Sequence, residues 1–152
     1  MMKYVLTTEH SFDGAHYLRG HRGACANIHG HRWRVVMEIG GNELQPEGSS
    51  RAMVMDFTDM KQEFRQLVDD FDHSLILEDT DMTMDDMHEV ETVHVNIAGE
   101  ETVTRAVYIG FRPTAENFSN YIYNVMKKKG YPVYAVTVYE TPTNSCRYCP
   151  QA

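Results

Sequence analysis

The sequence predicts an α+β fold in which strands form an antiparallel sheet and amphipathic helices cover it. Residues 3–12, 31–40 and 133–140 alternate apolar and polar side chains, as half-buried strands do. Residues 58–71 and 113–130 instead repeat apolar side chains every three to four positions, as helices do. With 152 residues, the chain has the length of one domain, since domains commonly run to about 100–150 residues.

The predicted strands each place alternate side chains on one face. The second strand carries its apolar side chains on the face that we expect to be buried: Trp33, Val35, Met37 and Ile39. MVMDF at 53–57 predicts a third, short strand. VYAVTVYE predicts the last strand, with Glu140 on the same face as Val136 and Val138.

Apolar stripes define the two predicted helices. The first stripe consists of Met60, Phe64, Leu67, Val68 and Phe71. Asp56 or Thr58 can cap the start of this helix. The second stripe consists of Phe118, Tyr121, Ile122, Val125 and Met126. This helix is predicted to begin at Pro113-Thr114 and to end at Gly130.

The segment from about 78 to 112 lies between the two helices. Residues 78–91, EDTDMTMDDMHEVE, are acidic and predict a solvated loop. Residues 93–111 contain two alternating runs around Ala98-Gly99 and predict a hairpin. We therefore expect an extra hairpin or loop at this point of the fold.

Composition narrows the classes of function. The net charge is −8, and residues 52–112 carry fifteen Asp and Glu against four Lys and Arg. The basic run Lys127 to Lys129 falls at a helix end, so we expect no nucleic-acid partner.

No stretch approaches the ~18 apolar residues that span a bilayer, and the N-terminus lacks signal-peptide features. Three cysteines are too few for a disulfide scaffold. We therefore expect a cytoplasmic protein with no membrane partner.

Histidines are concentrated in the N-terminal third of the chain, where five of the eight occur within 22 residues. If residues 29–39 are extended, His29 and His31 point to the same side as the predicted core. An imidazole buried there without a partner is costly, and a metal ion removes that cost by accepting the ring's lone pair.

A third metal ligand must come from elsewhere in the chain. His16 in FDGAH, just after the first strand, is the best placed. Three histidines with an open fourth position form the pattern of catalytic zinc sites. His10 and His21 compete for this place by the same reasoning. Hydrogen-bonded core histidines that hold no metal are the alternative.

Six motifs occur in order along most of the chain: FDGAH (12–16), CANIHGH (25–31), DF (56–57), DH (72–73), PTAEN (113–117) and YET (139–141). Together they resemble the family of 6-pyruvoyl-tetrahydropterin synthase and 6-carboxy-tetrahydropterin synthase. The resemblance implies the tunnelling fold, a four-stranded antiparallel sheet with two helices on one face. It also implies a homo-oligomer, a trimer or hexamer, in which the sheets join into a β-barrel and active sites lie between subunits.

The resemblance assigns the metal ligands and the catalytic cysteine. By position, His16, His29 and His31 resemble the family's zinc ligands, and Cys25 resembles its catalytic cysteine. A nearby Zn²⁺ and His73 would favour the thiolate that such a base requires. Read without the resemblance, Cys25 can equally be a buried, inert thiol.

The resemblance also assigns an acid–base pair and a substrate pocket. Asp72 and His73 resemble the pair, although a histidine at a helix C-terminus is an alternative reading. Glu140 resembles the carboxylate that anchors the pterin, since a carboxylate accepts two adjacent N–H groups side by side. A strand-end glutamate that reaches solvent is the alternative. Thr114 and Glu116 fall in the segment that lines the same pocket.

The implied reaction is that of a zinc-dependent lyase acting on 7,8-dihydroneopterin triphosphate. The carboxy branch forms 6-carboxy-5,6,7,8-tetrahydropterin, a precursor of 7-deazaguanine nucleosides such as queuosine. ETPTNSCRY (140–148), with a cysteine two residues before its tyrosine, is similar to that branch. A 6-pyruvoyl-tetrahydropterin synthase and a non-catalytic metal or pterin binder are the alternatives.

The sequence departs from the family pattern in two places. Residues 78–112 are longer than the usual link between the Asp-His and Pro-Thr motifs. Cys146 and Cys149 form a C-x-x-C pair without a second pair, which we interpret as structural or incidental.

Overall fold

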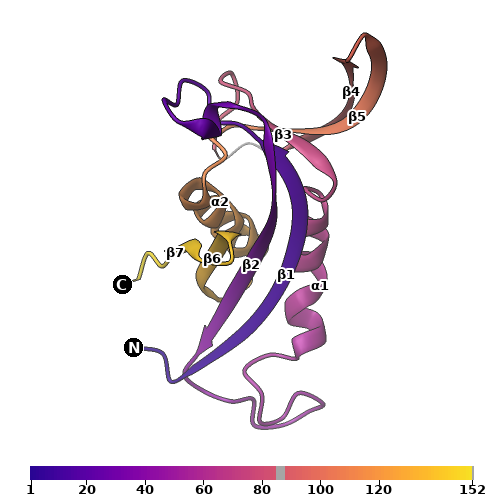
Figure 1. Cartoon of the computed structure of the whole chain (residues 1–152). Helices are drawn as coiled ribbons and strands as arrows, with labels where there is room; N and C mark the ends of the chain where they lie inside the picture. The colour runs from indigo at the N-terminus through magenta and orange to yellow at the C-terminus, as the bar shows by residue number, and fades with distance from the viewer. Residues whose placement is uncertain (85–87, 152) are drawn as a thin grey trace.

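The computed structural model of the chain describes residues 1–84 and 88–151. Its α+β architecture consists of one seven-stranded sheet and two α-helices (Figure 1). The strands are β1 (Tyr4–His16), β2 (His29–Gly41), β3 (Ser74–Glu78), β4 (Glu89–Ile97), β5 (Glu100–Ile109), β6 (Val133–Thr141) and β7 (Asn144–Tyr148). The helices are α1 (Phe57–Asp69) and α2 (Ala115–Lys128), with a short 3-10 helix at Ala24–Ala26. The strand order is β4-β5-β3-β1-β2-β6-β7.

β1 and β2 form the centre of the sheet. They pair antiparallel over 13 residues, from Tyr4 opposite Gly41 to His16 opposite His29. Both strands are longer than the predicted runs 3–12 and 31–40, because the alternation continues to the histidines. The pairing places the end of β1 directly beside the start of β2.

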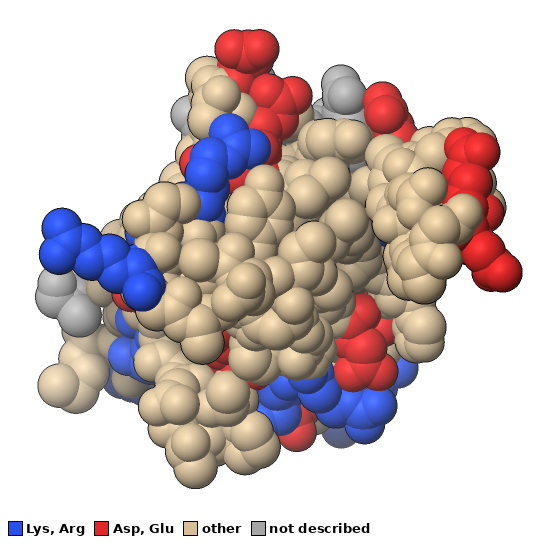
Figure 2. Space-filling model, turned by 45° about the horizontal axis from the view of Figure 1, so that its top comes forward, with Lys and Arg blue, Asp and Glu red and all other residues tan. Residues whose placement is uncertain are grey.

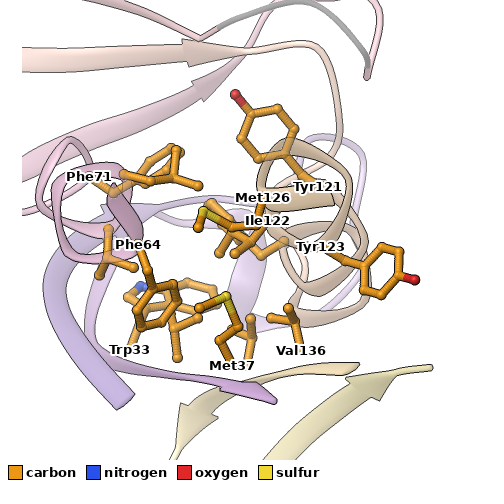
Figure 3. Close-up of a cluster of buried hydrophobic side chains, with 14 of the residues drawn as sticks. Trp33, Met37, Phe64, Phe71, Tyr121, Ile122, Tyr123, Met126 and Val136 are labelled. Carbon is orange, nitrogen blue, oxygen red and sulfur yellow. The ribbon is translucent and has the colours of Figure 1, made fainter. Parts of the chain in front are cut away.

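The predicted inward faces are confirmed. Trp33 and Phe64 are fully buried, and Phe12 stacks on Trp33 with 5.7 Å between ring centroids. The ring centroid of Phe118 in α2 lies 5.1 Å from that of Trp33. Phe64 of α1 belongs to the same cluster of buried side chains, so both helices share one core with β1 and β2 (Figure 3). Burying such side chains supplies most of the driving force for folding.

Both helices begin at the predicted caps. The Asp56 side chain accepts a hydrogen bond from Thr58 N–H at 2.7 Å, and the Thr114 hydroxyl accepts one from Asn117 N–H at 3.2 Å. These contacts satisfy backbone donors that lack a partner in the first turn. α2 ends before Gly130, whose φ of 98° suits glycine and terminates the helix.

The predicted hairpin is also confirmed. β4 and β5 pair around Ala98 and Gly99, whose φ values of 53° and 83° are the positive pair that a two-residue hairpin turn requires. The hairpin curves away from the rest of the sheet (Figure 1). β4 already begins at Glu89, inside the predicted loop 78–91, and residues 85–87 of that loop lie outside the described residues.

The expected four-stranded antiparallel sheet is wrong in two respects. The sheet has seven strands, and β3 pairs parallel with both β1 and β5. β3 and β7 have only five residues each, too few for a clear alternation. β3 connects the hairpin to β1, so the hairpin extends the sheet.

The strand expected at 53–57 is also wrong. The backbone of this stretch bonds within its own loop, from Gln45 N–H to Met53 C=O and from Ala52 N–H to Gln45 C=O. Ala52, directly before this stretch, has a φ of 66°, so extended backbone is interrupted at its start. Hydrogen bonds within the loop therefore determine the conformation of MVMDF, although its apolar composition favours a strand.

Charged side chains are unevenly distributed over the surface. On the face drawn in Figure 2, acidic and basic groups lie around a broad area that carries neither, and they form no continuous basic stripe there. None of the helices in the described residues is long and apolar enough to cross a bilayer.

Replacing a core phenylalanine should destabilise the protein strongly. We expect Phe64→Ala to lower the free energy of unfolding by about 3–5 kcal/mol, because it leaves a cavity beneath the sheet. Phe57→Ala is the matched control, since Phe57 is 56% exposed, and we expect a change below about 1 kcal/mol. Urea denaturation followed by circular dichroism measures both values. Equal losses for the two variants would contradict this description of the core.

Candidate active site

The central strand pair brings three histidines together. His16 ends β1 directly opposite His29 at the start of β2, and His31 follows two positions later on the same face. The ring centroid of His16 lies 4.6 Å from the ring centroid of His29 and 5.3 Å from that of His31. Trp33 forms the floor of this group, with its ring 4.8 Å from that of His16. The cluster thus lies on the hydrophobic core.

Two of the rings have their tautomer set by carbonyl groups. His16 Nδ1 lies 2.8 Å from the Pro113 carbonyl oxygen, and His29 Nδ1 lies 2.6 Å from that of Asn27. A carbonyl can only accept, so each Nδ1 carries the proton and donates it. The Nε2 atom of each neutral ring therefore presents a lone pair to the centre of the cluster.

The three Nε2 atoms of His16, His29 and His31 are buried and have no hydrogen-bond partner. Leaving buried polar atoms unpaired is costly, and native structures rarely do so. Burial lowers the pKa of His16 below its ordinary value, and the nearby His29 acts in the same direction, while the hydrogen bond to Pro113 opposes this shift. The lowered pKa favours the neutral ring that a metal ion requires.

Glu140 of β6 completes the cluster. Its Oε1 lies 3.1 Å from His31 Nε2 and 3.4 Å from His16 Nε2, without forming a hydrogen bond to either. The four side chains offer ligand atoms that all lie within 4.8 Å of one another. This group fits a divalent cation by its chemistry and by its unpaired nitrogens. Sequence reasoning placed Glu140 only at the pterin and missed its closeness to the imidazoles.

Asp72 and His73 lie together in the link between α1 and β3. His73 Nδ1 lies 2.9 Å from Asp72 Oδ2, and Asp72 Oδ1 accepts a hydrogen bond from Asp13 N–H at 2.8 Å. The bond from Asp13 N–H is the main reason that the pKa of Asp72 is lowered, and the contact with His73 adds to it. Asp72 is therefore held as the carboxylate. The pair lies beyond Asp69, where α1 ends, because β3 begins at Ser74 and pairs with β1 from there.

Two cavities share His31, near the start of β2, among their lining residues. One of about 1100 Å³ is lined by both His31 and His73, with Val95 and Thr104 of the hairpin on another side. The other, of about 440 Å³, is lined by His31 and Glu140. His31 of the histidine cluster and His73 of the pair thus line the same cavity.

The remaining predicted site residues do not belong to the histidine cluster or to the linings of these two cavities. Cys25 is half-buried in the 3-10 helix and is not a member of the four-residue cluster. Thr114 caps α2 directly after Pro113, which contacts His16. Glu116 is exposed in the first turn of that helix. Their catalytic or binding roles remain predictions.

His10 and His21, the competing ligand candidates, lie outside the cluster. His10 Nε2 instead lies 2.7 Å from Asp69 Oδ1. The structure also adds two residues that sequence reasoning did not assign to the site: Asp13, which holds the side chain of Asp72, and Arg105, which holds its backbone carbonyl. Their contacts join positions 59 and 33 residues apart, so no local signal reveals them.

Comparisons with known proteins agree with this fold. A solved structure of an uncharacterized protein, WS1659 from Wolinella succinogenes, matches with a TM-score of 0.70 at 19% identity and covers 96% of this chain and 97% of that chain. Caenorhabditis elegans 6-pyruvoyl tetrahydropterin synthase matches with a TM-score of 0.62 at 24% identity, over 98% of both chains. At these identities the likeness shows the fold alone.

Sequence relatives are closer. A protein of Haemophilus influenzae named 6-carboxy-5,6,7,8-tetrahydropterin synthase is 33% identical over 147 residues, 95% of this chain and 98% of the relative. A Synechocystis protein of the same name is 28% identical, over 95% of this chain and 92% of the relative. The family model described as 6-pyruvoyl tetrahydropterin synthase matches residues 5–151. The chain therefore belongs to the 6-pyruvoyl tetrahydropterin synthase family.

Proposed function

We propose that the chain is a zinc-dependent lyase that converts 7,8-dihydroneopterin triphosphate and water to 6-carboxy-5,6,7,8-tetrahydropterin, acetaldehyde and triphosphate. The observation that carries this proposal is the set of three buried, unpaired Nε2 atoms beside a carboxylate. The names of the Haemophilus and Synechocystis relatives support the carboxy product. This product would feed the formation of 7-deazaguanine nucleosides such as queuosine in the cytoplasm.

The zinc ion would be held by His16, His29 and His31, because their unpaired Nε2 atoms converge. The Nδ1 atoms of His16 and His29 donate to backbone carbonyls instead. Bound there, zinc would polarise the side-chain oxygens of the substrate and make adjacent protons easier to remove. Glu140 would accept the N–H groups of the pterin edge, with Thr114 and Glu116 lining the same pocket.

The protons would be moved by residues of this family's motifs. Cys25 would act as the thiolate base. Asp72 would orient His73, which would exchange protons with the substrate. The 2.9 Å contact between Asp72 and His73, and the position of His73 on the cavity that His31 also lines, support these roles.

The subunit arrangement follows the same proposal. One domain of 1–152 would assemble as a trimer or hexamer whose sheets join into a β-barrel with active sites between subunits. The outer edge of β1 supports this assembly, because it pairs with β3 only at Gly14 and Ala15. Its remaining edge can accept a strand of a second copy.

Metal content tests the ligand set. We expect purified protein to contain about one zinc ion per chain, and His29→Ala to lose it, because one of the three converging lone pairs is gone. His10→Ala is the matched control and should keep the metal, since His10 contacts Asp69 instead. Elemental analysis measures both. Metal retained by His29→Ala and lost by His10→Ala would show that the ligands lie elsewhere.

Acetaldehyde distinguishes the two reaction products. We expect incubation of the zinc-loaded protein with 7,8-dihydroneopterin triphosphate to release acetaldehyde and triphosphate in equal amounts, because the carboxy product has lost two side-chain carbons. An aldehyde-trapping assay with mass spectrometry measures this release. Triphosphate without acetaldehyde would instead identify a 6-pyruvoyl-tetrahydropterin synthase, the reaction for which the matching family is named.

Replacing Cys25 tests the proposed base. We expect Cys25→Ala to lower turnover by about 10²- to 10⁴-fold, the usual contribution of a general base, with zinc content unchanged. Cys146→Ala, which changes a half-buried thiol on β7, serves as the control and should keep its activity. Steady-state kinetics measures both. Full activity in Cys25→Ala would rule out the thiolate mechanism, and no turnover in the wild type would favour a non-catalytic binder.

A further inference from the structure

The link between α1 and β3 holds an unusual backbone conformation at the proposed acid–base pair. His73 has a φ of 50°, in the left-handed region. A residue with a Cβ atom is disfavoured there, so surrounding contacts must hold it in place. The contacts that do so determine where the His73 ring points.

One side of the link is held by β1. Asp13 N–H donates to Asp72 Oδ1 at 2.8 Å, and the Asp13 carbonyl accepts a hydrogen bond from His73 N–H at 2.7 Å. Both contacts use backbone atoms of Asp13. The Asp13 carboxylate is itself occupied by Arg32, at 2.9 and 3.0 Å. Together these bonds fix the carboxylate of the pair and one end of the peptide group between Asp72 and His73.

The other end of the same peptide group is held by Arg105. Its Nη1 donates to the Asp72 carbonyl at 2.8 Å. The N–H and the C=O of one peptide group are therefore fixed from opposite sides, by β1 and by β5. A peptide group is planar, so fixing both ends restricts ψ of Asp72 and φ of His73 together. A charged donor makes the Arg105 contact stronger than a neutral one.

Arg105 belongs to β5 of the hairpin and not to the central strand pair of β1 and β2. β5 pairs with β3 from Leu75 opposite Ala106 onward, so Arg105 lies beside the link at the point where this pairing begins. The same hairpin lines the cavity that contains His73, through Val95 and Thr104. The β4–β5 hairpin thus reaches the proposed catalytic pair.

We propose that Arg105 is a positioning residue for the Asp72–His73 pair, so that the β4–β5 hairpin supplies part of the active-site framework. This inference rests on the proposed function. By holding the Asp72 carbonyl, Arg105 keeps His73 Nδ1 on the Asp72 carboxylate and His73 at the cavity. The contact lies within one chain, so it acts on His73 whichever subunit's substrate that ring serves.

Substitution of Arg105 tests this role. Arg105→Met removes the donors and keeps an unbranched apolar stem, whereas Arg105→Lys keeps a cationic donor. We expect Arg105→Met to lower kcat about tenfold, the usual effect of losing one hydrogen bond to a charged group. KM, zinc content and the urea midpoint should stay at their wild-type values. Arg105→Lys should recover most of the lost kcat.

Hydrogen exchange supplies a measurement that does not need turnover. The His73 amide donates to Asp13, so we expect its exchange to become about tenfold faster in Arg105→Met. Amides of β2, such as that of Val35, should exchange as in the wild type. Arg65→Met is the matched control, because Arg65 is exposed on α1, and it should leave both kcat and the His73 exchange rate unchanged.

The outcomes separate this inference from the proposed function. Wild-type kcat in Arg105→Met overturns the positioning role, whether or not the amide exchanges faster. A urea midpoint that falls together with faster exchange in β2 overturns it too, because Arg105 would then act on global stability. A wild-type protein without turnover, but with the exchange effect confined to His73, overturns the proposed function and leaves Arg105 holding the link.

Discussion

The antiparallel pairing of β1 with β2 is the constraint on which the rest of the structure depends. Its register places His16 opposite His29, and the alternation of a strand then places His31 on the same face. A shift of one residue would turn His29 and His31, together with Trp33, to the other face of the sheet. The hydrophobic core and the histidine cluster are thus set by one register, and the packing of Trp33 against Phe12 and Phe118 stabilises both.

The second half of the site comes from segments that attach to this pair. β3 joins the end of β1 at Gly14 and Ala15, which brings the preceding Asp72–His73 link against Asp13. The hairpin joins the sheet through β5. It is also held at its base by His88, whose Nε2 lies 2.9 Å from Asp70 Oδ2 and whose Nδ1 lies 3.0 Å from the Tyr121 hydroxyl oxygen. The hairpin is therefore bound to the C-cap of α1 and to α2 as well as to the sheet.

Features with a local physical cause could be predicted from the sequence. The helix caps, the hairpin turn and the inward face of β2 each follow from side chains within a few positions of one another. Features that depend on distant contacts could not. β3 is short and gains its place by pairing with β1 and β5, while the run at 53–57 is apolar enough for a strand but closes a loop of its own.

The candidate site shows the same division. The spacing of His29 and His31 on one strand face points to a ligand pair, and the family motifs supply His16, Asp72 and His73. The nearness of Glu140 to the imidazoles depends on the register between β2 and β6, where Arg34 lies opposite Tyr139. Arg105 lies in a segment outside the motifs, and its contact with Asp72 crosses 33 residues. Such a contact is visible only once the sheet is assembled.

Trp33 belongs to the core and to the histidine cluster at once. It is the chain's single tryptophan, fully buried, with His16 and His31 at the edge of its ring. A substitution at this position must both fill the interior and support the rings of His16 and His31. A change in the packing around the indole would therefore also move the histidine rings that contact it. The geometry of the histidine cluster thus depends on the packing of the hydrophobic core.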